Sequence, residues 1–315
     1  MRSYEHLLSF CVEHPWALTK PMVETIAGIL ARRVAGHTES AEDIQAAIAN
    51  RQRLPQPGGG AVAIIPVYGV LAPRANMMTE TSGMASYDVL AAQLREVVKT
   101  ESIATIVLDV DSPGGSVAGA TEFAKEVLKA RSKKPVVAVA QYTMASAAYW
   151  IASCATEIVA APSAKVGSVG VFAIHDDLSK ALENEGINRT YIRAGKFKAD
   201  DNETQPLDGE AAARWQRMVD DALATFHADV AKGRGVAIDA VRTGFGQGAV
   251  MSADDALAAG MIDRIATLDD TVKRLAAGDK SSMAAHDDTP AVIAGRVPDR
   301  LWRAQAEYAL LETEL

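Results

Sequence analysis

The stretch PVVAVAQYTMASAAYWIAS, residues 135–153, joins an apolar run to a segment of small, uncharged residues through a short turn. Residues 135–140 are apolar throughout, which is typical of a strand buried on both faces of a parallel sheet. Residues 145–153 predict a closely packed helix that begins near Ser146. Ser146 then either caps that helix, the commoner use of serine there, or presents its hydroxyl for chemistry.

Strands and helices alternate on both sides of this stretch. Strands are expected at residues 61–71, 103–112, 135–140, 156–162, 167–173 and 187–195. Helices are expected at about residues 86–99, 117–131, 178–186, 209–232, 236–242 and 252–259. This alternation of apolar strands with helices predicts an α/β fold with a mainly parallel sheet.

Shifts in composition divide the chain into four parts. Residues 1–52 are expected to form a helical N-terminal extension, because their apolar residues recur at helical spacing. Two prolines and three glycines make RLPQPGGG, residues 53–60, a linker. Residues 61–278 hold the alternating strands and helices and form the main domain. Residues 279–315 are expected to be a flexible segment followed by a short C-terminal helix.

The bulk composition argues against several classes of function. The chain has 315 residues, and its formal net charge of −8 argues against a general nucleic-acid binder and against docking on anionic lipid. No apolar stretch approaches the ~20 residues that a membrane span needs, and the N-terminus does not have the pattern of a signal peptide. The two cysteines, Cys11 and Cys154, are far apart and predict reduced thiols. We therefore expect a cytoplasmic protein.

A glycine-rich turn follows the strand expected at 103–112. In DSPGGSV, residues 111–117, Gly114 and Gly115 allow a turn whose backbone N–H groups point outward next to a helix start. Such a turn holds an anion or a developing oxyanion, although a tight strand-to-helix connection also needs glycine for steric reasons alone. It is not a phosphate-binding loop, because no Gly-Lys-Ser/Thr follows at the required spacing.

Two lysines follow the strand expected at 187–195. In YIRAGKFKADD, residues 191–201, Lys196 and Lys198 are two positions apart, so both lie on one face of an extended segment. A solvated loop is the ordinary setting for lysine. A lysine moved into an apolar site loses its proton more easily and then serves as a general base, which a serine hydroxyl needs.

Histidine is the usual base for a serine nucleophile, and the chain has six histidines. His175 follows the strand expected at 167–173 and precedes Asp176 and Asp177, so a Ser146–His175–Asp arrangement is a second possibility. No His-Glu-x-x-His or comparable spacing predicts a metal site.

With these residues in view, the chain resembles the signal peptide peptidase A family, which are serine–lysine peptidases on the Clp protease/crotonase fold. It resembles especially the capsid-assembly, or head maturation, proteases of tailed phages within that family. The resemblance spans residues 62–266 and implies an α/β domain of stacked βαβ units over 61–278. It is carried, in the family's order, by IPVYGVL (65–71), VLDVDSPGGSV (107–117), VAVAQYTMASAAYWIASCATEIVAAPSAKVGSVGV (137–171), AGKFKADD (194–201) and MSADDALAAGMIDRI (251–265).

The resemblance also implies roles for individual residues. Ser146 matches the family's nucleophile, and Lys198 matches its general base. Gly115 matches the oxyanion-hole glycine, and the N–H of Ala147 would supply the second donor. Ser168, in VGSVGV, matches a serine that orients the lysine amine. The family often has two glycines after the serine, whereas two alanines follow here, and we expect tighter geometry with activity retained.

What the resemblance implies is a serine endopeptidase with a Ser/Lys dyad and no cofactor or metal. Its expected partners are peptide or protein substrates, further copies of itself in a homo-oligomer, and phage or prophage capsid, scaffold or portal proteins. Its expected location is the bacterial host cytoplasm or the phage procapsid. Three alternatives stay open: a cytoplasmic peptidase that degrades signal peptides, a crotonase-like acyl-CoA enzyme, and a non-catalytic assembly scaffold. The acyl-CoA enzyme would need a carboxylate acid/base on the active-site strands.

Overall fold

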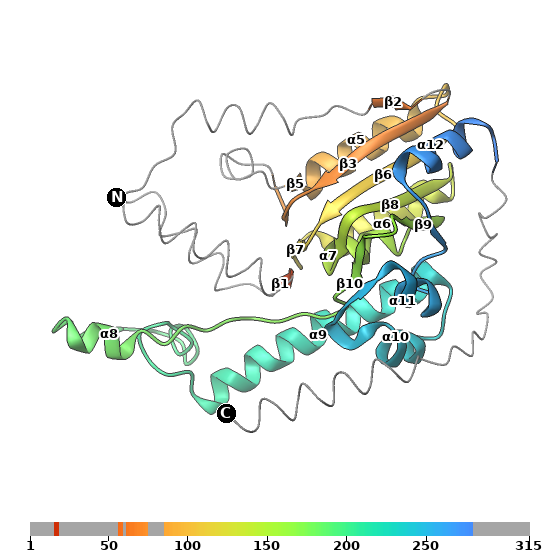
Figure 1. The fold of residues 1–315 in the computed structure, drawn as a ribbon. Coiled ribbons are helices and arrows are strands. Elements are labelled where there is room, and N and C mark those ends of the chain that lie inside the picture. Colours follow the sequence, from red (N-terminus) through yellow and green to blue (C-terminus); the bar gives the residue numbers. More distant parts are fainter. Residues whose placement is uncertain (1–15, 19–55, 59–60, 75–84, 280–315) are drawn as a thin grey trace.

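The computed structural model describes residues 16–18, 56–58, 61–74 and 85–279, and it builds them around a large, mainly parallel sheet with helices on both faces (Figure 1). The large sheet contains β2 (Gln56–Gly58), β3 (Val62–Tyr68), β6 (Thr105–Ser112), β8 (Val136–Ala145), β9 (Glu157–Ala160), β10 (Lys165–Gly167), β11 (Val250–Ser252) and β12 (Arg264–Ile265). A smaller sheet contains β1 (Trp16–Leu18), β4 (Leu71–Ala72), β5 (Ala85–Ser86) and β7 (Gly114–Ser116).

The strand order determines which segments meet at the end of β8. The large sheet runs β11-β10-β8-β6-β3-β2, with parallel pairing in its centre and antiparallel pairing of β2 and β11 at its edges. Strand β8 pairs with two strands along the same edge: residues 137–140 pair with β9, and residues 143–145 pair with β10. Ser146 directly follows this second pairing, at the carboxyl end of the strand, where open α/β sheets build their sites.

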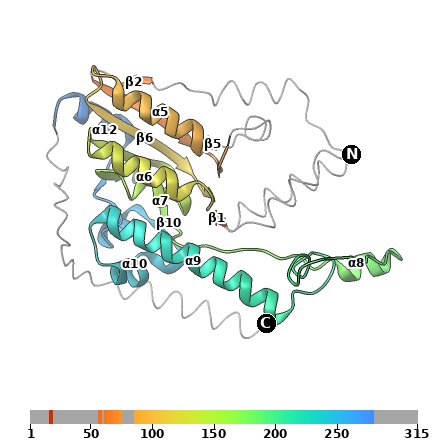
Figure 2. The ribbon, with the colours of Figure 1, turned by 180° about the vertical axis from the view of Figure 1, so that it is seen from behind.

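Helices cover both faces of the sheet (Figure 2). They are α5 (Tyr87–Lys99), α6 (Ala120–Arg131), α7 (Ala147–Ala152), α8 (Ser179–Asn184), α9 (Gly209–Arg234), α10 (Ile238–Gly244), α11 (Ala253–Ala258) and α12 (Leu268–Ala276), with a 3₁₀ turn at Gly246–Gly248. In β6, Ile106 and Leu108 face the core shared with α5 and α6, whereas Val107 faces a second core that includes Leu275 of α12. The two-residue repeat of the strand therefore buries both of its faces.

Helix α7, the one that follows Ser146, is held by its neighbours. All six of its residues are buried, so their small side chains serve close packing as well. Trp150 stacks on Phe226 of α9 with ring centroids 4.3 Å apart, and its indole N–H donates to Asp229 at 2.9 Å. The hydroxyl of Tyr149 donates to the carbonyl oxygen of Met261 at 2.9 Å. A helix this short depends on such tertiary contacts, because its own hydrogen bonds do not stabilise it in water.

Two buried ion pairs hold C-terminal elements in place. They lie in what we call the body, that is, the two sheets and the helices packed on them. The guanidinium of Arg234 lies 2.6 Å from Asp263, and that of Arg274 lies 2.7 Å from Glu157. Burial disfavours the charged form of Arg234, but the hydrogen bonds and charge of Asp263 outweigh it and raise the pKa of Arg234 above its ordinary value. Removal of Asp263 would leave the buried guanidinium of Arg234 without its ion-pair partner, which is destabilising. Glu157 has a second partner in Arg264 at 3.5 Å.

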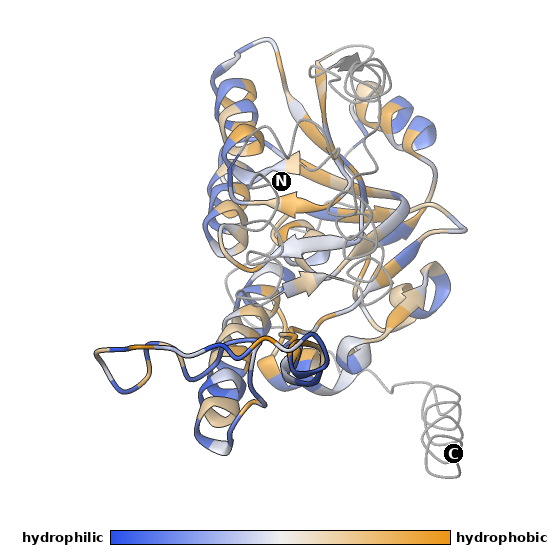
Figure 3. Cartoon of the chain, turned by 90° about the vertical axis from the view of Figure 1, so that its left-hand side faces the viewer, coloured by the Kyte–Doolittle hydropathy of each residue, from blue (hydrophilic) through white to orange (hydrophobic). Residues whose placement is uncertain are grey.

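Residues 173–208, which we call the arm, extend away from the body beside the N-terminal half of α9 (Figures 1 and 3). Asp200 is the only buried residue of the arm. Residues 212–225 of α9, beside the arm, include no buried residue. The arm exposes a set of large apolar side chains, among them Ile192 at 100% exposure. Those side chains belong to Leu178, Ile187, Tyr191, Ile192 and Phe197.

Several predicted elements are confirmed. The strands expected at 103–112 and 135–140 are β6 and β8, and the helices expected at 86–99, 117–131 and 209–232 are α5, α6 and α9. None of the described helices is long and apolar enough to cross a membrane.

Other expectations are wrong. Residues 187–195 form no strand, because they lie in the arm, where no neighbouring strand offers hydrogen bonds. The strand expected at 167–173 ends at Gly167, with a single bridge further on at Phe172. Within the stretch expected to be helical, Trp16–Leu18 is strand β1, and within the expected linker, Gln56–Gly58 is edge strand β2. The rest of the N-terminal extension and residues 280–315 lie outside the described residues.

We predict that Trp150→Ala lowers the free energy of unfolding by about 3–5 kcal/mol, because it removes a fully buried ring and its stack on Phe226. Equilibrium urea denaturation, followed by circular dichroism, measures this loss. The matched control is Trp215→Ala, which removes the same side chain from the part of α9 that lies outside the body. Equal losses for the two variants would contradict the role of Trp150 in fixing α7.

Candidate active site

Ser146 lies between the end of β8 and the start of α7 in a backbone conformation that L-residues rarely adopt. Its φ is 54° and its ψ is −120°. Its N–H donates to the carbonyl oxygen of Gly167 at 2.7 Å, and its own carbonyl accepts from the N–H of Trp150 at 2.9 Å. A serine on a sharp strand-to-helix turn presents its Oγ at the end of the sheet, and the strain persists only because the surroundings impose it.

The hydroxyl of Ser146 does not cap the helix. The residue occupies the N-cap position of α7, yet its side chain accepts no hydrogen bond from the helix backbone. Instead, Oγ lies 3.5 Å from the carbonyl oxygen of Gly170, at the outer limit of a hydrogen bond. The capping role, which was the more common alternative for this residue, is therefore not the one observed.

Ser168 lies next to Ser146 in space. The pairing of Gly167 with Ala145 sets the ends of β10 and β8 side by side, so the serines that follow them are neighbours. Ser168 also has a φ of 54°, and its N–H donates to the carbonyl oxygen of Ala249 at 2.8 Å. Two adjacent strands thus end in strained, buried serines at the same edge of the sheet.

The glycine-rich turn passes directly beside the nucleophile candidate. A Cβ on Gly114 would lie 2.9 Å from Cβ of Ser146, and a Cβ on Gly115 would lie 2.0 Å from the carbonyl oxygen of Leu71 in β4. Both positions therefore require glycine because other backbone passes within contact distance. The N–H of Gly114 donates to the hydroxyl of Ser112 at 3.2 Å, which fixes the turn at the end of β6.

Ala147 is the first residue of α7, and the N–H groups of a first helical turn have no partner within the helix. It is fully buried, as is the neighbouring turn that carries Gly115. The sequence-predicted nucleophile, the two oxyanion-hole residues and Ser168 therefore belong to segments that converge at one end of the sheet.

Lys198 is placed differently. It lies in the exposed arm, and the described residues provide no hydrogen bond or ion pair for its amine. The amine of Lys196 donates to Glu210 at 2.8 Å and lies 4.7 Å from the ring centroid of Phe197. Residues 196–198 form a turn, so the extended arrangement expected for the two lysines is wrong. Within one chain, the structure does not bring Lys198 to Ser146.

His175 is also part of the arm. Its Nε2 lies 3.1 Å from the carbonyl oxygen of Asn202, and its ring packs edge-on against Trp215. The neighbouring Asp177 accepts hydrogen bonds from Ser179, which lower the pKa of this carboxyl. These contacts tie His175 to α9 and the arm, and none of them involves Ser146.

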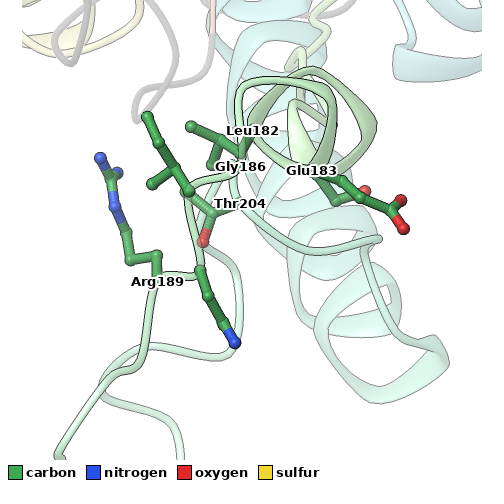
Figure 4. A pocket seen from close by; sticks show the side chains of 8 residues that line it. Leu182, Glu183, Gly186, Arg189 and Thr204 are labelled. Atoms are coloured by element: carbon green, nitrogen blue, oxygen red, sulfur yellow. The ribbon is translucent and has the colours of Figure 1, made fainter.

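The arm has a hollow of its own. An open pocket of about 320 Å³ is lined only by residues of α8 and the neighbouring parts of the arm. Figure 4 shows these side chains from close by. Leu182, Glu183, Gly186, Arg189 and Thr204 are labelled there. This pocket is a feature of the arm alone and is separate from the serine site.

The remaining candidates for chemistry have structural partners. The carboxylate of Asp109 accepts hydrogen bonds from the hydroxyl of Tyr68 and, at 2.8 Å, from the amide of Gln141. Partial burial raises the pKa of Asp111, and a hydrogen bond from the backbone of Thr143 opposes that rise. Among the described residues, no group of three or more side chains could hold a metal ion.

Comparisons with known proteins match the part of the chain that carries these residues. Residues 129–282 match the model of Peptidase family S49, a range that includes Ser146, Ser168 and Lys198. The chain is 33% identical to the head-tail preconnector protein GP5 of Enterobacteria phage P21 over 68% of this chain and 42% of that protein. It is 31% identical to capsid assembly protease C of Escherichia phage lambda over 67% of this chain and 48% of that protein.

Cellular proteins are similar as well. Protease 4 of Salmonella typhi is 31% identical over 71% of this chain and 35% of its own length. This chain spans less than half the length of each of these three relatives. The chain carries a Peptidase family S49 domain, and its α/β architecture is that of the Clp protease/crotonase fold.

Sequence reasoning missed one segment of this site. Strand β1, Trp16–Leu18, pairs with β7 next to Ser146, although residues 1–52 were expected to be helical. The signal was present in HPWALTKP, where Pro15 and Pro21 flank the segment. Proline disfavours helix both at its own position and at the residue before it, so the pair indicated an extended segment.

We predict that Ser146→Gly is more stable than Ser146→Ala by about 1–2 kcal/mol, because glycine adopts the positive φ without strain. Thermal unfolding of the two variants measures the difference. Ser153 provides the control pair, since its φ of −58° suits any residue. There, Ser153→Ala should be the more stable variant. If alanine were the more stable replacement at residue 146 as well, Ser146 would not be strained.

Proposed function

We propose that this chain is a serine endopeptidase that hydrolyses peptide bonds with Ser146 as nucleophile and Lys198 as general base. The observation that carries the proposal is the strained Ser146 at the strand-to-helix junction, whose hydroxyl caps no helix and lies beside the Gly114–Gly115 turn. A hydroxyl held this way, next to backbone N–H donors, suits attack on a carbonyl carbon. The match to Peptidase family S49 supports the same chemistry.

In the proposed reaction, Oγ of Ser146 bonds to the carbonyl carbon of the substrate while the amine of Lys198 accepts its proton. The N–H groups of Gly115 and Ala147 stabilise the oxyanion that forms. The C–N bond then breaks as the lysine returns the proton to the leaving amine, and an ester of Ser146 remains. Water hydrolyses this ester with the lysine again as base, which regenerates the enzyme. Ser168, the neighbour of Ser146, orients the lysine amine.

We further propose that Lys198 acts on the Ser146 of a neighbouring copy in a homo-oligomer. The arm that carries Lys198 extends from the body (Figure 1). It exposes a series of apolar side chains. Packing of this arm on another copy would bury those side chains and remove the lysine amine from water. Removal from water favours the neutral amine that a general base requires. A head-to-tail arrangement of this kind generates a ring when its rotation closes.

The proposed substrates are phage or prophage head proteins, with action in the bacterial host cytoplasm or the procapsid. Two of the most similar relatives are named for head-tail connection and capsid assembly, which supports this role. Degradation of signal peptides is the alternative favoured by the likeness to the putative signal peptide peptidase SppA of Enterococcus faecium, which is 26% identical over 66% of this chain. The acyl-CoA and scaffold alternatives have no such support. For the former, the Asp109 carboxylate on β6 is already held by Tyr68 and Gln141.

We predict that Ser146→Ala and Lys198→Ala each reduce cleavage of unfolded casein by at least about 1,000-fold, because each removes one half of the proposed dyad. Lys196→Ala should retain activity, since the amine of Lys196 is engaged by Glu210. Mass spectrometry of the products measures cleavage. If wild type is inactive on casein, the same variants are compared during co-expression with the neighbouring phage structural proteins. Undiminished cleavage by Ser146→Ala would exclude Ser146 as the nucleophile.

We also predict that mixed oligomers of Ser146→Ala and Lys198→Ala chains recover activity. If the dyad forms between neighbouring copies, about a quarter of the sites in an equal, random mixture combine an intact serine with an intact lysine. Co-expression of the two chains followed by the casein assay measures the recovery. The control replaces one chain by the double variant Ser146→Ala/Lys198→Ala, which should restore nothing. Absence of recovery in mixed oligomers would mean that the dyad forms within one chain.

A further inference from the structure

Strand β1 lies in the position of a bound peptide. It contains three residues, Trp16–Leu18, and pairs antiparallel with β7 on the side opposite β4. On its other side, the N–H of Trp16 donates to the carbonyl oxygen of Phe172 at 2.8 Å, and the N–H of Phe172 donates back at 3.1 Å. The segment is therefore held by backbone on both sides, between the glycine-rich turn and the chain that follows Ser168.

The register of the strand pairing places Ala17 next to Ser146, the proposed nucleophile. Ala17 pairs with Gly115, the residue assigned to the oxyanion hole. A Cβ on Gly114 would lie 2.2 Å from the carbonyl oxygen of Ala17 and 2.9 Å from Cβ of Ser146, so the carbonyl and the serine border the same point. Trp16 is 2% exposed, and Ala17 and Ser146 are 0% exposed. A carbonyl group of the chain itself thus lies beside the serine that would attack a substrate.

Extended peptides bind to exposed sheet edges through main-chain hydrogen bonds, with pockets that select alternate side chains. Without β1, strand β7 would present such an edge directly beside Ser146. Strand β1 places the buried Trp16 and Ala17 along this edge, so the edge accommodates an extended segment with a small residue beside Ser146.

We propose that Trp16–Leu18 is an internal occupant of the substrate groove, which competes with substrate and has to leave before a peptide binds. This inference rests on the proposed function, because it takes Ser146 as the centre of the groove. It assigns the N-terminal segment a regulatory role and predicts that the groove accepts an extended peptide with an aromatic residue followed by a small one. Molecules whose groove is filled by β1 cannot bind substrate. The apparent affinity for substrate is therefore lowered in proportion to the fraction of molecules with an empty groove.

The test uses full-length chains that cannot cleave. The probe is a fluorescein-labelled synthetic peptide with the sequence HPWALTKP, residues 14–21. Its affinity is measured by fluorescence anisotropy for Ser146→Ala and for the double variant Ser146→Ala/Ala17→Asp. A carboxylate at the fully buried Ala17 position has no compensating partner of its own, so the strand leaves the groove. The expected result is a Kd at least about tenfold lower for the double variant, because its groove is empty.

The matched control is Ser146→Ala/Ala258→Asp, which adds the same charge at an exposed alanine of α11 and should bind like Ser146→Ala. Equal affinity for all three chains, or failure of the emptied groove to bind its own sequence, overturns the proposal. Because none of these chains cleaves, the result is independent of catalysis. The casein assay with wild type tests the proposed function separately, so either can fail alone.

A second measurement covers the case in which Ala17→Asp disturbs folding. Hydrogen exchange of Ser146→Ala is followed by mass spectrometry with and without excess peptide. The amide of Trp16, bonded to Phe172, should be protected in the free chain and exposed when the peptide fills the groove. Protection that persists while the peptide is bound would show that β1 is a permanent strand of the fold.

Discussion

The positive φ of Ser146 is the constraint on which the arrangement of this site depends. Two contacts impose it: the hydrogen bond from its N–H to Gly167 at the end of β10, and the packing of α7 through Trp150 against Phe226. Each contact comes from a different layer, the sheet on one side and the helices on the other. A strained residue persists only where its surroundings over-determine it, so the burial of α7 is a requirement of the site and not only of the core.

The same constraint explains the glycines of the neighbouring turn. With Ser146 fixed at the end of β8, strand β7 passes so close that Gly114 has no room for a side chain, whereas at Gly115 the backbone of Leu71 leaves no room. The close approach lets β7 present one edge to β4 and the other to Trp16–Leu18. The positions of the proposed nucleophile, the proposed oxyanion donors and β1 therefore follow from one packing arrangement, in which Lys198 of the same chain has no part.

The body and the arm are held together by different kinds of contact. The body is held by two apolar cores and by the buried pairs Arg234–Asp263 and Arg274–Glu157, whereas the arm is mostly exposed. The arm contacts α9 through isolated polar and aromatic contacts, such as Asp200 with Arg214 at 2.8 Å. A segment of this composition is suited to ordering against a second surface, which accords with the proposal that Lys198 acts on a neighbouring copy.

Sequence patterns were enough to predict the α/β class and the central strands, because buried strands and glycine turns leave local patterns that survive without tertiary context. Those patterns left Ser146 open between a helix cap and a nucleophile, and it was the resemblance to a known family that singled out Ser146 and Lys198. The spatial arrangement was needed to find that Ser146 caps no helix, that residues 187–195 form no strand, and that Trp16–Leu18 lies beside Ser146. These outcomes depend on which segments meet in space. Pairing between residues a hundred positions apart leaves no mark in the local spacing of either one.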